Sequence, residues 1–289
     1  MNYPIKMLTM FLTASTVVLP LAVVSAATSF VRKKAGSIWQ DGLFIGDGAT
    51  AAMVYAPMHL EWMINRNDVL DSRVFECDYL SHDKVMACVA TNDGRSVAFL
   101  RVAERPSIKG PADGDRLTLS MSAAILRVRF WSGVGWSMPS IPATRQELDT
   151  RTGELSSKMT SPFLTPEALS FIERSRDVMV VDIGDPNAPE RHAVIELARP
   201  EDPRLDALPF AWQVSDGTVS FTQKMPGGED YAVALTAPGE VRTIGRTARL
   251  NASGSRTLFL AVRTTRDAAD PRGAAVTAVK AAEKDGFAK

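Results

Sequence analysis

The sequence has few of the features that announce a catalytic or nucleic-acid-binding protein. Its 33 Lys and Arg residues equal its 33 Asp and Glu residues, so zero net charge gives no reason to expect nucleic acid as a partner. It contains no Gly-x-Ser-x-Gly, Walker, Gly-x-Gly-x-x-Gly or His-Glu-x-x-His motif. Its three histidines have no second histidine or cysteine at metal-ligand spacing. The sequence therefore predicts no cofactor and no metal.

Long apolar runs are equally scarce. One run, residues 7–24, follows Lys6 and ends in the small-x-small sequence Val24-Ser25-Ala26, which is typical of a signal peptide cleaved after Ala26. No other stretch supports a multi-span membrane protein. The sequence predicts a periplasmic or secreted protein. The alternative is a retained single anchor in the inner membrane, with Arg32-Lys33-Lys34 near the lipid.

The only two cysteines occupy matching positions of a predicted hairpin. Residues 73–102 contain three β-rich runs separated by turn signals at 81–84 and 92–95. If the first turn is a four-residue loop, Cys77 lies opposite Cys88 at a non-hydrogen-bonded pair, where Cα atoms approach to about 4.5 Å. In the oxidising compartment that export implies, the sequence predicts a structural Cys77–Cys88 disulfide; two buried free thiols are the alternative.

The remaining elements are predicted mostly as strands. Alternating patterns cover 117–122 and 127–130, and an apolar strand at 178–183 is expected to have 193–197 as its hairpin or crossover partner. One helix is predicted from Thr165-Pro166-Glu167, with Thr165 as its N-cap, to about Arg176.

A predicted boundary follows a run of prolines at 200, 203 and 209. After the signal peptide (1–26), residues 27–205 are expected to form a β-rich domain that contains the disulfide. Residues 206–289 are expected to form a small C-terminal β-sandwich or barrel with a basic tail, ending in a short helix or frayed tail at 274–284. Short strands are expected there at 211–214, 219–222, 231–235, 242–250 and 257–264. The predicted fold class is mainly β with a few short helices (β-rich α+β), built on an antiparallel meander.

Two features are candidates for ligand or partner contact. Trp131 and Trp136 flank a Gly-rich loop and could stack on a sugar or grip a peptide, or could be core residues. The tail is basic: residues 240–289 hold 10 Lys and Arg against 5 Asp and Glu, whereas 27–239 hold 22 against 28. Its Arg242, Arg246 and Arg249 could contact an anionic partner, or could pair with the acidic body.

Two segments together resemble a known family. Residues 73–102 contain a strand–Cys–turn–Cys–strand unit (Phe75-Glu76-Cys77 to Met86-Ala87-Cys88) with an Asp-Gly turn, and 163–198 contain a predicted helix–strand–turn–strand unit. These units resemble parts of the invasion-associated locus B family of alphaproteobacterial periplasmic proteins. The chain departs from the family by lacking a second cysteine pair and by having Val74-Phe75 where a Trp is common. The resemblance implies a β-rich, non-enzymatic envelope protein linked to host interaction or envelope maintenance.

These observations lead to one functional expectation and two alternatives. The expectation is an exported, envelope-associated, non-enzymatic protein that binds an envelope protein, anionic lipid or polysaccharide. The first alternative is an inner-membrane-anchored structural component of an envelope or secretion assembly. The second is a hydrolase whose site joins His59 or His192 to an acid and a serine from distant parts of the chain.

Overall fold

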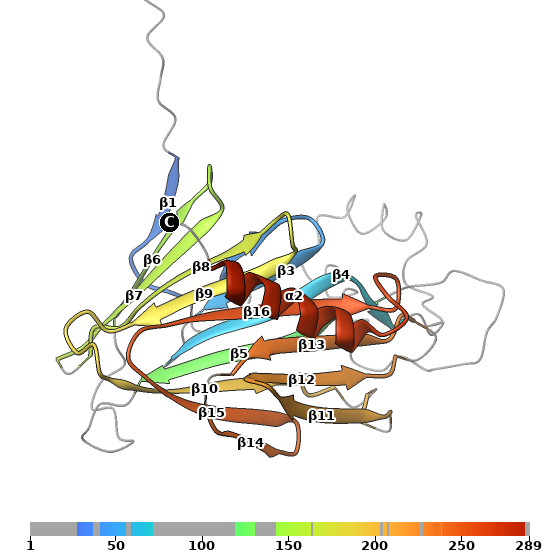
Figure 1. The fold of residues 1–289 in the computed structure, drawn as a ribbon. Coiled ribbons are helices and arrows are strands. Elements are labelled where there is room, and N and C mark those ends of the chain that lie inside the picture. The colour runs from blue at the N-terminus through green and yellow to red at the C-terminus, as the bar shows by residue number, and fades with distance from the viewer. Residues whose placement is uncertain are drawn as a thin grey trace, which may run out of the picture.

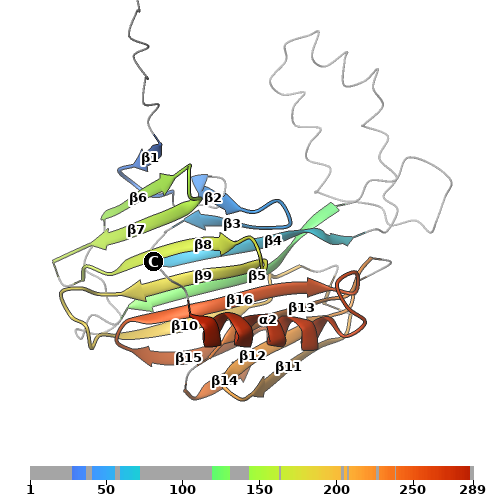
Figure 2. The ribbon, with the colours of Figure 1, turned by 45° about the horizontal axis from the view of Figure 1, so that its top comes forward.

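The computed structural model of the chain describes residues 28–36, 41–55, 59–71, 119–130, 143–162, 164–202, 205–206, 208–225, 228–237 and 239–286. Within them, two antiparallel sheets, one of nine strands and one of seven, lie one above the other (Figures 1 and 2). One helix packs on the outer face of the nine-stranded sheet. The mainly β fold class predicted from the sequence is therefore confirmed. The hairpin at 73–102 lies outside the described residues, so the Cys77–Cys88 disulfide has no support from the structure and stays a prediction.

The larger sheet has nine strands in the order β1-β6-β7-β8-β9-β16-β13-β12-β11. Its strands are β1 (Ser29–Arg32), β6 (Ala143–Asp149), β7 (Glu154–Thr160), β8 (Glu167–Glu173), β9 (Val178–Gly184), β11 (Phe210–Ser215), β12 (Thr218–Gln223), β13 (Tyr231–Thr236) and β16 (Arg256–Thr264). The smaller sheet has seven strands in the order β14-β15-β10-β5-β4-β3-β2. Its strands are β2 (Leu43–Gly46), β3 (Thr50–Tyr55), β4 (Leu60–Asp71), β5 (Leu119–Phe130), β10 (His192–Ala198), β14 (Val241–Ile244) and β15 (Thr247–Ser253).

The core lies between the sheets because each strand sends alternate side chains inward. Trp62 and Ile64 of β4, Leu126 of β5 and Leu250 of β15 meet Val233 of β13 and other strands of the larger sheet in one apolar cluster. All five are at most 1% exposed. Burying each such side chain contributes about 1.5–3 kcal/mol relative to leaving it in water.

The strands on the two sides of the predicted 205/206 boundary share both sheets. β15 pairs with β10, and β16 pairs with β9, so strands that follow residue 206 are hydrogen-bonded to strands that precede it. The apolar cluster also includes residues from both sides. The C-terminal strands are thus built into the common sandwich rather than into a separate one.

Two local predictions are wrong. The segment after Thr165 is strand β8, not a helix, because it pairs with β9 along its length and with β7 over residues 167–170. The Thr165 hydroxyl donates to Asp185 Oδ1 at 2.9 Å instead of capping a helix. Of the two alternatives for 178–183 and 193–197, the hairpin is wrong, because β9 and β10 lie in different sheets and the chain crosses from one sheet to the other between them.

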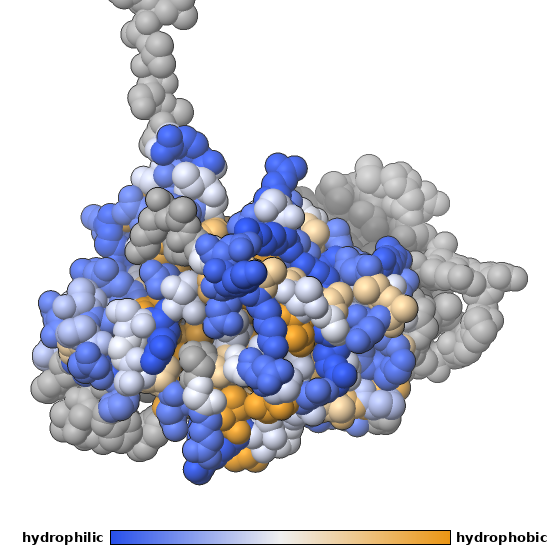
Figure 3. Space-filling model, viewed as in Figure 1, coloured by the Kyte–Doolittle hydropathy of each residue, from blue (hydrophilic) through white to orange (hydrophobic). Residues whose placement is uncertain are grey.

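The segment at 274–284, predicted as a short helix or a frayed tail, belongs to the C-terminal helix α2 (Pro271–Asp285). Asp270 is its N-cap, and the Asp270 carboxylate accepts a hydrogen bond from the Gly273 N–H at 3.0 Å. Its buried residues, Ala275, Val279 and Ala282, pack on the outer face of the nine-stranded sheet. The face of the molecule that carries α2 is mostly hydrophilic, broken by small apolar patches (Figure 3).

Candidate functional site

A row of polar side chains crosses the outer face of the seven-stranded sheet. The strand registers place one such residue of each strand opposite the next, across six neighbouring strands. In order from β3 to β14 these residues are Tyr55, Glu61, Arg127, Glu196, Arg249 and Arg242. We call this set the charged row. Acidic and basic residues alternate at its centre, which favours cross-strand pairing.

Glu61 is the most strongly held carboxylate of the charged row. It is 6% exposed, and its Oε2 accepts from Arg127 Nε at 2.6 Å and lies 3.0 Å from His59 Nε2. The Tyr55 hydroxyl donates to Oε1. Burial raises the pKa of Glu61, but hydrogen bonds from His59, Tyr55 and Arg127 outweigh it and lower the pKa to about 2. Burial and the Glu61 carboxylate raise the pKa of Tyr55. Glu61 therefore stays ionised at neutral pH.

Glu196 is the second buried carboxylate of the charged row, at 3% exposed. Its Oε1 accepts from Arg249 Nε at 3.0 Å, and its Oε2 lies 3.3 Å from Arg129 Nη2. Two guanidinium groups thus compensate one buried charge, which removes much of the cost of burial.

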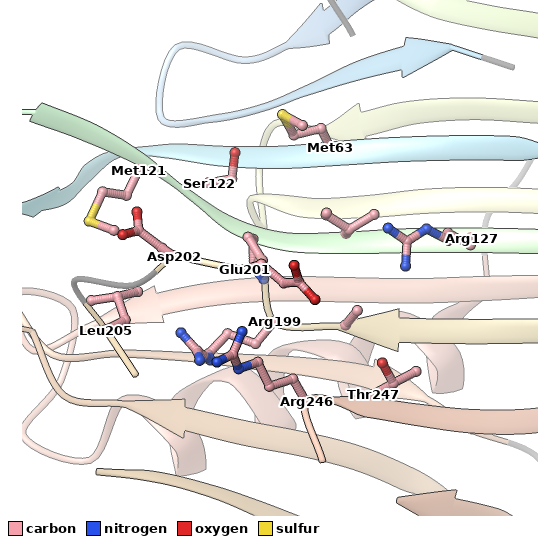
Figure 4. A pocket seen from close by; sticks show the side chains of 13 residues that line it. Met63, Met121, Ser122, Arg127, Arg199, Glu201, Asp202, Leu205, Arg246 and Thr247 are labelled. Atoms are coloured by element: carbon pink, nitrogen blue, oxygen red, sulfur yellow. The ribbon is translucent and has the colours of Figure 1, made fainter. Parts of the chain in front are cut away.

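A pocket of about 560 Å³ lies beside the charged row, where β10 ends (Figure 4). We call it the Arg199 pocket. Its polar lining includes Arg127, Arg199, Glu201, Asp202 and Arg246. Its other lining residues are Met63, Met121, Ser122, Ile125, Ala198, Pro200, Leu205 and Thr247. Arg127 belongs to both features: it lines the pocket, and it binds Glu61 within the charged row.

A β-bulge shapes one wall of the pocket. The β4–β5 register shifts by one residue between the pairs Ile64↔Ala124 and Asn65↔Ser122. Such a bulge re-aims the side chains next to it. A second, larger irregularity between the pairs Asn65↔Ser122 and Leu70↔Ser120 spans Met121. The consecutive residues Met121 and Ser122 both line the pocket there, although neighbours on a regular strand point to opposite faces.

Arg199 and Arg246 lie together on the pocket wall (Figure 4). The Arg199 N–H donates to the Arg246 carbonyl at 2.9 Å, which continues the β10–β15 ladder beyond Ala198↔Thr247. Both guanidinium groups bind Asp206 Oδ1, Arg199 through Nη2 at 3.0 Å. Hydrogen bonds from these two arginines lower the pKa of Asp206. Gly245 at φ 55° makes the tight turn that sets Arg246 in place.

The structure brings together some of the predicted contact residues and leaves others apart. Arg246 lines the Arg199 pocket, Arg249 belongs to the charged row, and Arg242 lies opposite Arg249. All three have an acidic partner: Asp206, Glu196 and Glu240, respectively. Trp131 and Trp136 lie outside the described residues.

The histidines do not form the predicted hydrolase arrangement in the described part of the chain. His59 contacts the acid Glu61, as a hydrolase site would require. The other side chains bound to Glu61 are Arg127 and Tyr55, and neither is the serine that the predicted site needs. His192 is exposed at the start of β10. Among the described residues no group of three or more His, Cys, Asp or Glu is arranged to hold a metal ion.

Sequence reasoning missed Glu61, Glu196 and Arg199. A signal for the two carboxylates was present, because Glu61 lies between Leu60 and Trp62, and Glu196 between Ile195 and Leu197. A charge inside such an apolar strand run has to find a buried partner. Arg199 carried no comparable signal.

Comparison with known proteins identifies a fold but no family. No protein-family model and no curated protein matches the chain. A solved structure from the human microbiome, named as a kojibiose phosphorylase, matches with a TM-score of 0.54 and 9% identity. The match covers 90% of this chain and 36% of that protein, so the chain spans about a third of its length. At this identity the likeness shows the fold alone.

This finding corrects the functional expectation. The sequence predicted an exported, non-enzymatic binding protein, but the matching fold occurs in a protein named for an enzymatic activity. The prediction rested on the absence of catalytic motifs, and that absence says nothing about sites assembled from distant residues. The invasion-associated locus B resemblance is untested by these comparisons and stays a prediction.

One finding bears on membrane insertion. No helix in the described part of the chain is both long enough and apolar enough to span a bilayer.

Proposed function

We propose that this protein takes part in the enzymatic processing of a saccharide, and that the Arg199 pocket binds the sugar. The observation that carries the proposal is the composition of the pocket: carboxylates of Glu201 and Asp202 and guanidinium groups of Arg199 and Arg246 surround one cavity of about 560 Å³. That volume lies within the range of small-molecule sites. The solved structure named as a kojibiose phosphorylase supports the same chemical class through its name.

The lining suits a sugar ring. Carboxylates accept hydrogen bonds from sugar hydroxyl groups, and guanidinium groups donate hydrogen bonds to the hydroxyl oxygens. Met63 and Ile125, both half-buried, offer apolar surface for the C–H faces of a ring. In many glycoside-processing enzymes a pair of Asp or Glu residues serves as general acid and as base or nucleophile. Glu201 and Asp202 are the pair that we assign to this role.

The proposal is tested by turnover. The purified chain would be incubated with kojibiose and a panel of other disaccharides, with and without inorganic phosphate, and released reducing sugar and consumed phosphate would be measured. We expect turnover of at least one disaccharide and a fall of about 10²-fold or more in Glu201→Gln, which removes a proton-transferring group. Turnover of none, kojibiose included, would overturn the proposal.

Glu240→Gln is the matched control. The Glu240 side chain is 75% exposed and pairs with the equally exposed Arg242 at 3.1 Å, away from the pocket lining. The same chemical change should leave turnover unaltered there. An equal loss in both variants would mean that the effect at Glu201 is not local.

We also propose that the chain is exported and cleaved after Ala26, and that Cys77 pairs with Cys88. The run at 7–24 after Lys6, with the small residues before Ala27, supports export, and the hairpin register supports the disulfide. Mass spectrometry of the mature amino terminus tests cleavage, because an intact Met1 supports the anchored alternative. Thiol titration of the unreduced protein tests the disulfide, and two free thiols would contradict it.

A further inference from the structure

Arg199 is a buried cation with unused hydrogen-bonding capacity. Its side chain is 3% exposed, and its Nε and Nη1 have no hydrogen-bond partner among the described residues. Nε carries one N–H group and Nη1 carries two. Leaving donors of a charged group unpaired and out of water is costly, and such groups normally find a partner. Because Arg199 lines the pocket, a pocket ligand can be that partner.

The backbone forces a second cation against the first. Arg199 and Arg246 are cross-strand neighbours at the end of the β10–β15 ladder, joined by the 2.9 Å hydrogen bond between their main chains. Like charges at opposing positions of a sheet repel each other. Both bind a single carboxylate, Asp206, which is 41% exposed. Two guanidinium groups therefore share one partly solvated carboxylate.

The Arg199 guanidinium is also held in place. It lies over the Phe210 ring, with Cζ 5.4 Å from the ring centroid, and Asp206 holds its Nη2. A cation fixed in this way needs little reorganisation when it binds an anion, so less of the binding free energy is lost to ordering. The carboxylate of Glu201 on the same pocket belongs to an exposed residue, where solvent screens it.

We infer that Arg199 and Arg246 form an oxyanion subsite that takes a phosphate or carboxylate group. This inference deepens the proposed function and rests on it for the molecule that carries the anion: a free phosphate, or an acidic group on the saccharide. Charge-assisted hydrogen bonds from guanidinium to these groups are among the strongest in proteins. The unpaired Nε and Nη1 of Arg199 and the guanidinium group of the adjacent Arg246 supply the donors.

Isothermal titration calorimetry of the full chain with inorganic phosphate, glucuronate and glucose tests the inference. We expect phosphate or glucuronate to bind and Arg246→Gln to weaken that binding about tenfold or more, as loss of a charge-assisted hydrogen bond implies. The Arg246 side chain is 34% exposed, so this variant can fold even where Arg199→Gln fails to. Arg151→Gln, which changes a 76% exposed arginine outside both the charged row and the pocket lining, should have no effect. Binding of neither anion would overturn the inference, as would equal binding by wild type and Arg246→Gln.

The variant Asp206→Asn distinguishes a ligand-binding role of the two arginines from a purely structural one. Asp206 competes with a ligand for both guanidinium groups, so its neutral isostere should bind the anion several-fold more tightly. If Asp206 and the arginines were only a structural link, the variant would lose stability and gain no affinity, and the inference would fail.

The two proposals fail in different ways. Disaccharide turnover without anion binding would overturn the oxyanion subsite alone. Anion binding that depends on Arg246, without turnover of any disaccharide, would support the subsite and overturn the enzymatic proposal. Binding of phosphate but not glucuronate would assign the subsite to free or esterified phosphate, and the reverse result would assign it to an acidic sugar.

Discussion

The outer faces of the two sheets are built in opposite ways. The outer face of the nine-stranded sheet offers Val178, Val180 and Phe259 to the helix α2, which covers them with Ala275 and Val279. The outer face of the seven-stranded sheet instead carries the charged row, whose buried carboxylates are held by guanidinium groups. One face gains stability from apolar burial, and the other keeps ionised groups that are costly to bury. Such groups, with a pocket beside them, mark the face suited to ligand chemistry.

The largest effect should come from opening the helix-covered face. Phe259→Ala removes a 5% exposed ring beneath α2, so we expect a loss of about 3–4 kcal/mol in the free energy of unfolding, measured by urea titration. Phe44→Ala is the control on the other sheet, where the ring is 56% exposed and the loss should stay below about 0.5 kcal/mol. Similar losses of unfolding free energy in the two variants would contradict the view that apolar burial stabilises one outer face and not the other.

The second effect is the pH dependence that Glu61 of the charged row contributes. The pKa of Glu61 is about 2 in the folded chain and ordinarily near 4.5, so Glu61 binds its proton more weakly when folded. Its contribution is complete above about pH 4.5 and is lost as the pH falls through about 2. It amounts to something on the order of 3 kcal/mol. Acid unfolding of Glu61→Gln should therefore be shallower than that of wild type over this range.

The exposed Glu240→Gln serves as the control for that experiment, because the Glu240 side chain is 75% exposed. Its acid unfolding curve should follow the wild-type curve. If Glu61→Gln also follows it, the carboxylate is not held as the contacts of the charged row indicate.

The smallest effect should come from the cap of α2. Asp270→Ala removes the acceptor of the 3.0 Å hydrogen bond from Gly273 N–H and should cost about 1 kcal/mol. Asp270→Asn retains a side-chain acceptor and should cost much less. Hydrogen exchange resolves the effect, since the amides of α2 should lose protection while those of β5 keep theirs. An equal loss of amide protection in α2 and β5 would mean that the helix-covered face does not open separately from the seven-stranded sheet.

Local patterns predicted the strands well where tertiary pairing agreed with them. The strand expected at 219–222 is β12 (Thr218–Gln223), and Asp216-Gly217 before it has both residues at positive φ, 47° and 69°, as a type I′ turn requires. The single strand expected at 242–250 is instead the hairpin of β14 and β15, because Gly245 turns the chain. A lone glycine within a strand-like segment is a weak turn signal.

The candidate site could be predicted only in fragments. Arg246 was singled out from the basic tail, but its neighbour across the ladder is Arg199, which is 47 positions earlier in the sequence. Arg127 and Glu61 come from still other strands. No single segment carries a motif, since the pocket exists only once β4, β5, β10 and β15 lie side by side. Pairing order, which sequence patterns do not specify, decides which residues meet.

The pairing of β16 with β9 has a consequence for how the chain is made. On the ribosome, residues 178–184 emerge long before residues 256–264, and until then one edge of β9 lacks its hydrogen-bonding partner. Contacts so distant in sequence slow folding and leave strand edges open to wrong partners. The nine-stranded sheet therefore closes only after residues 256–264 have been synthesised.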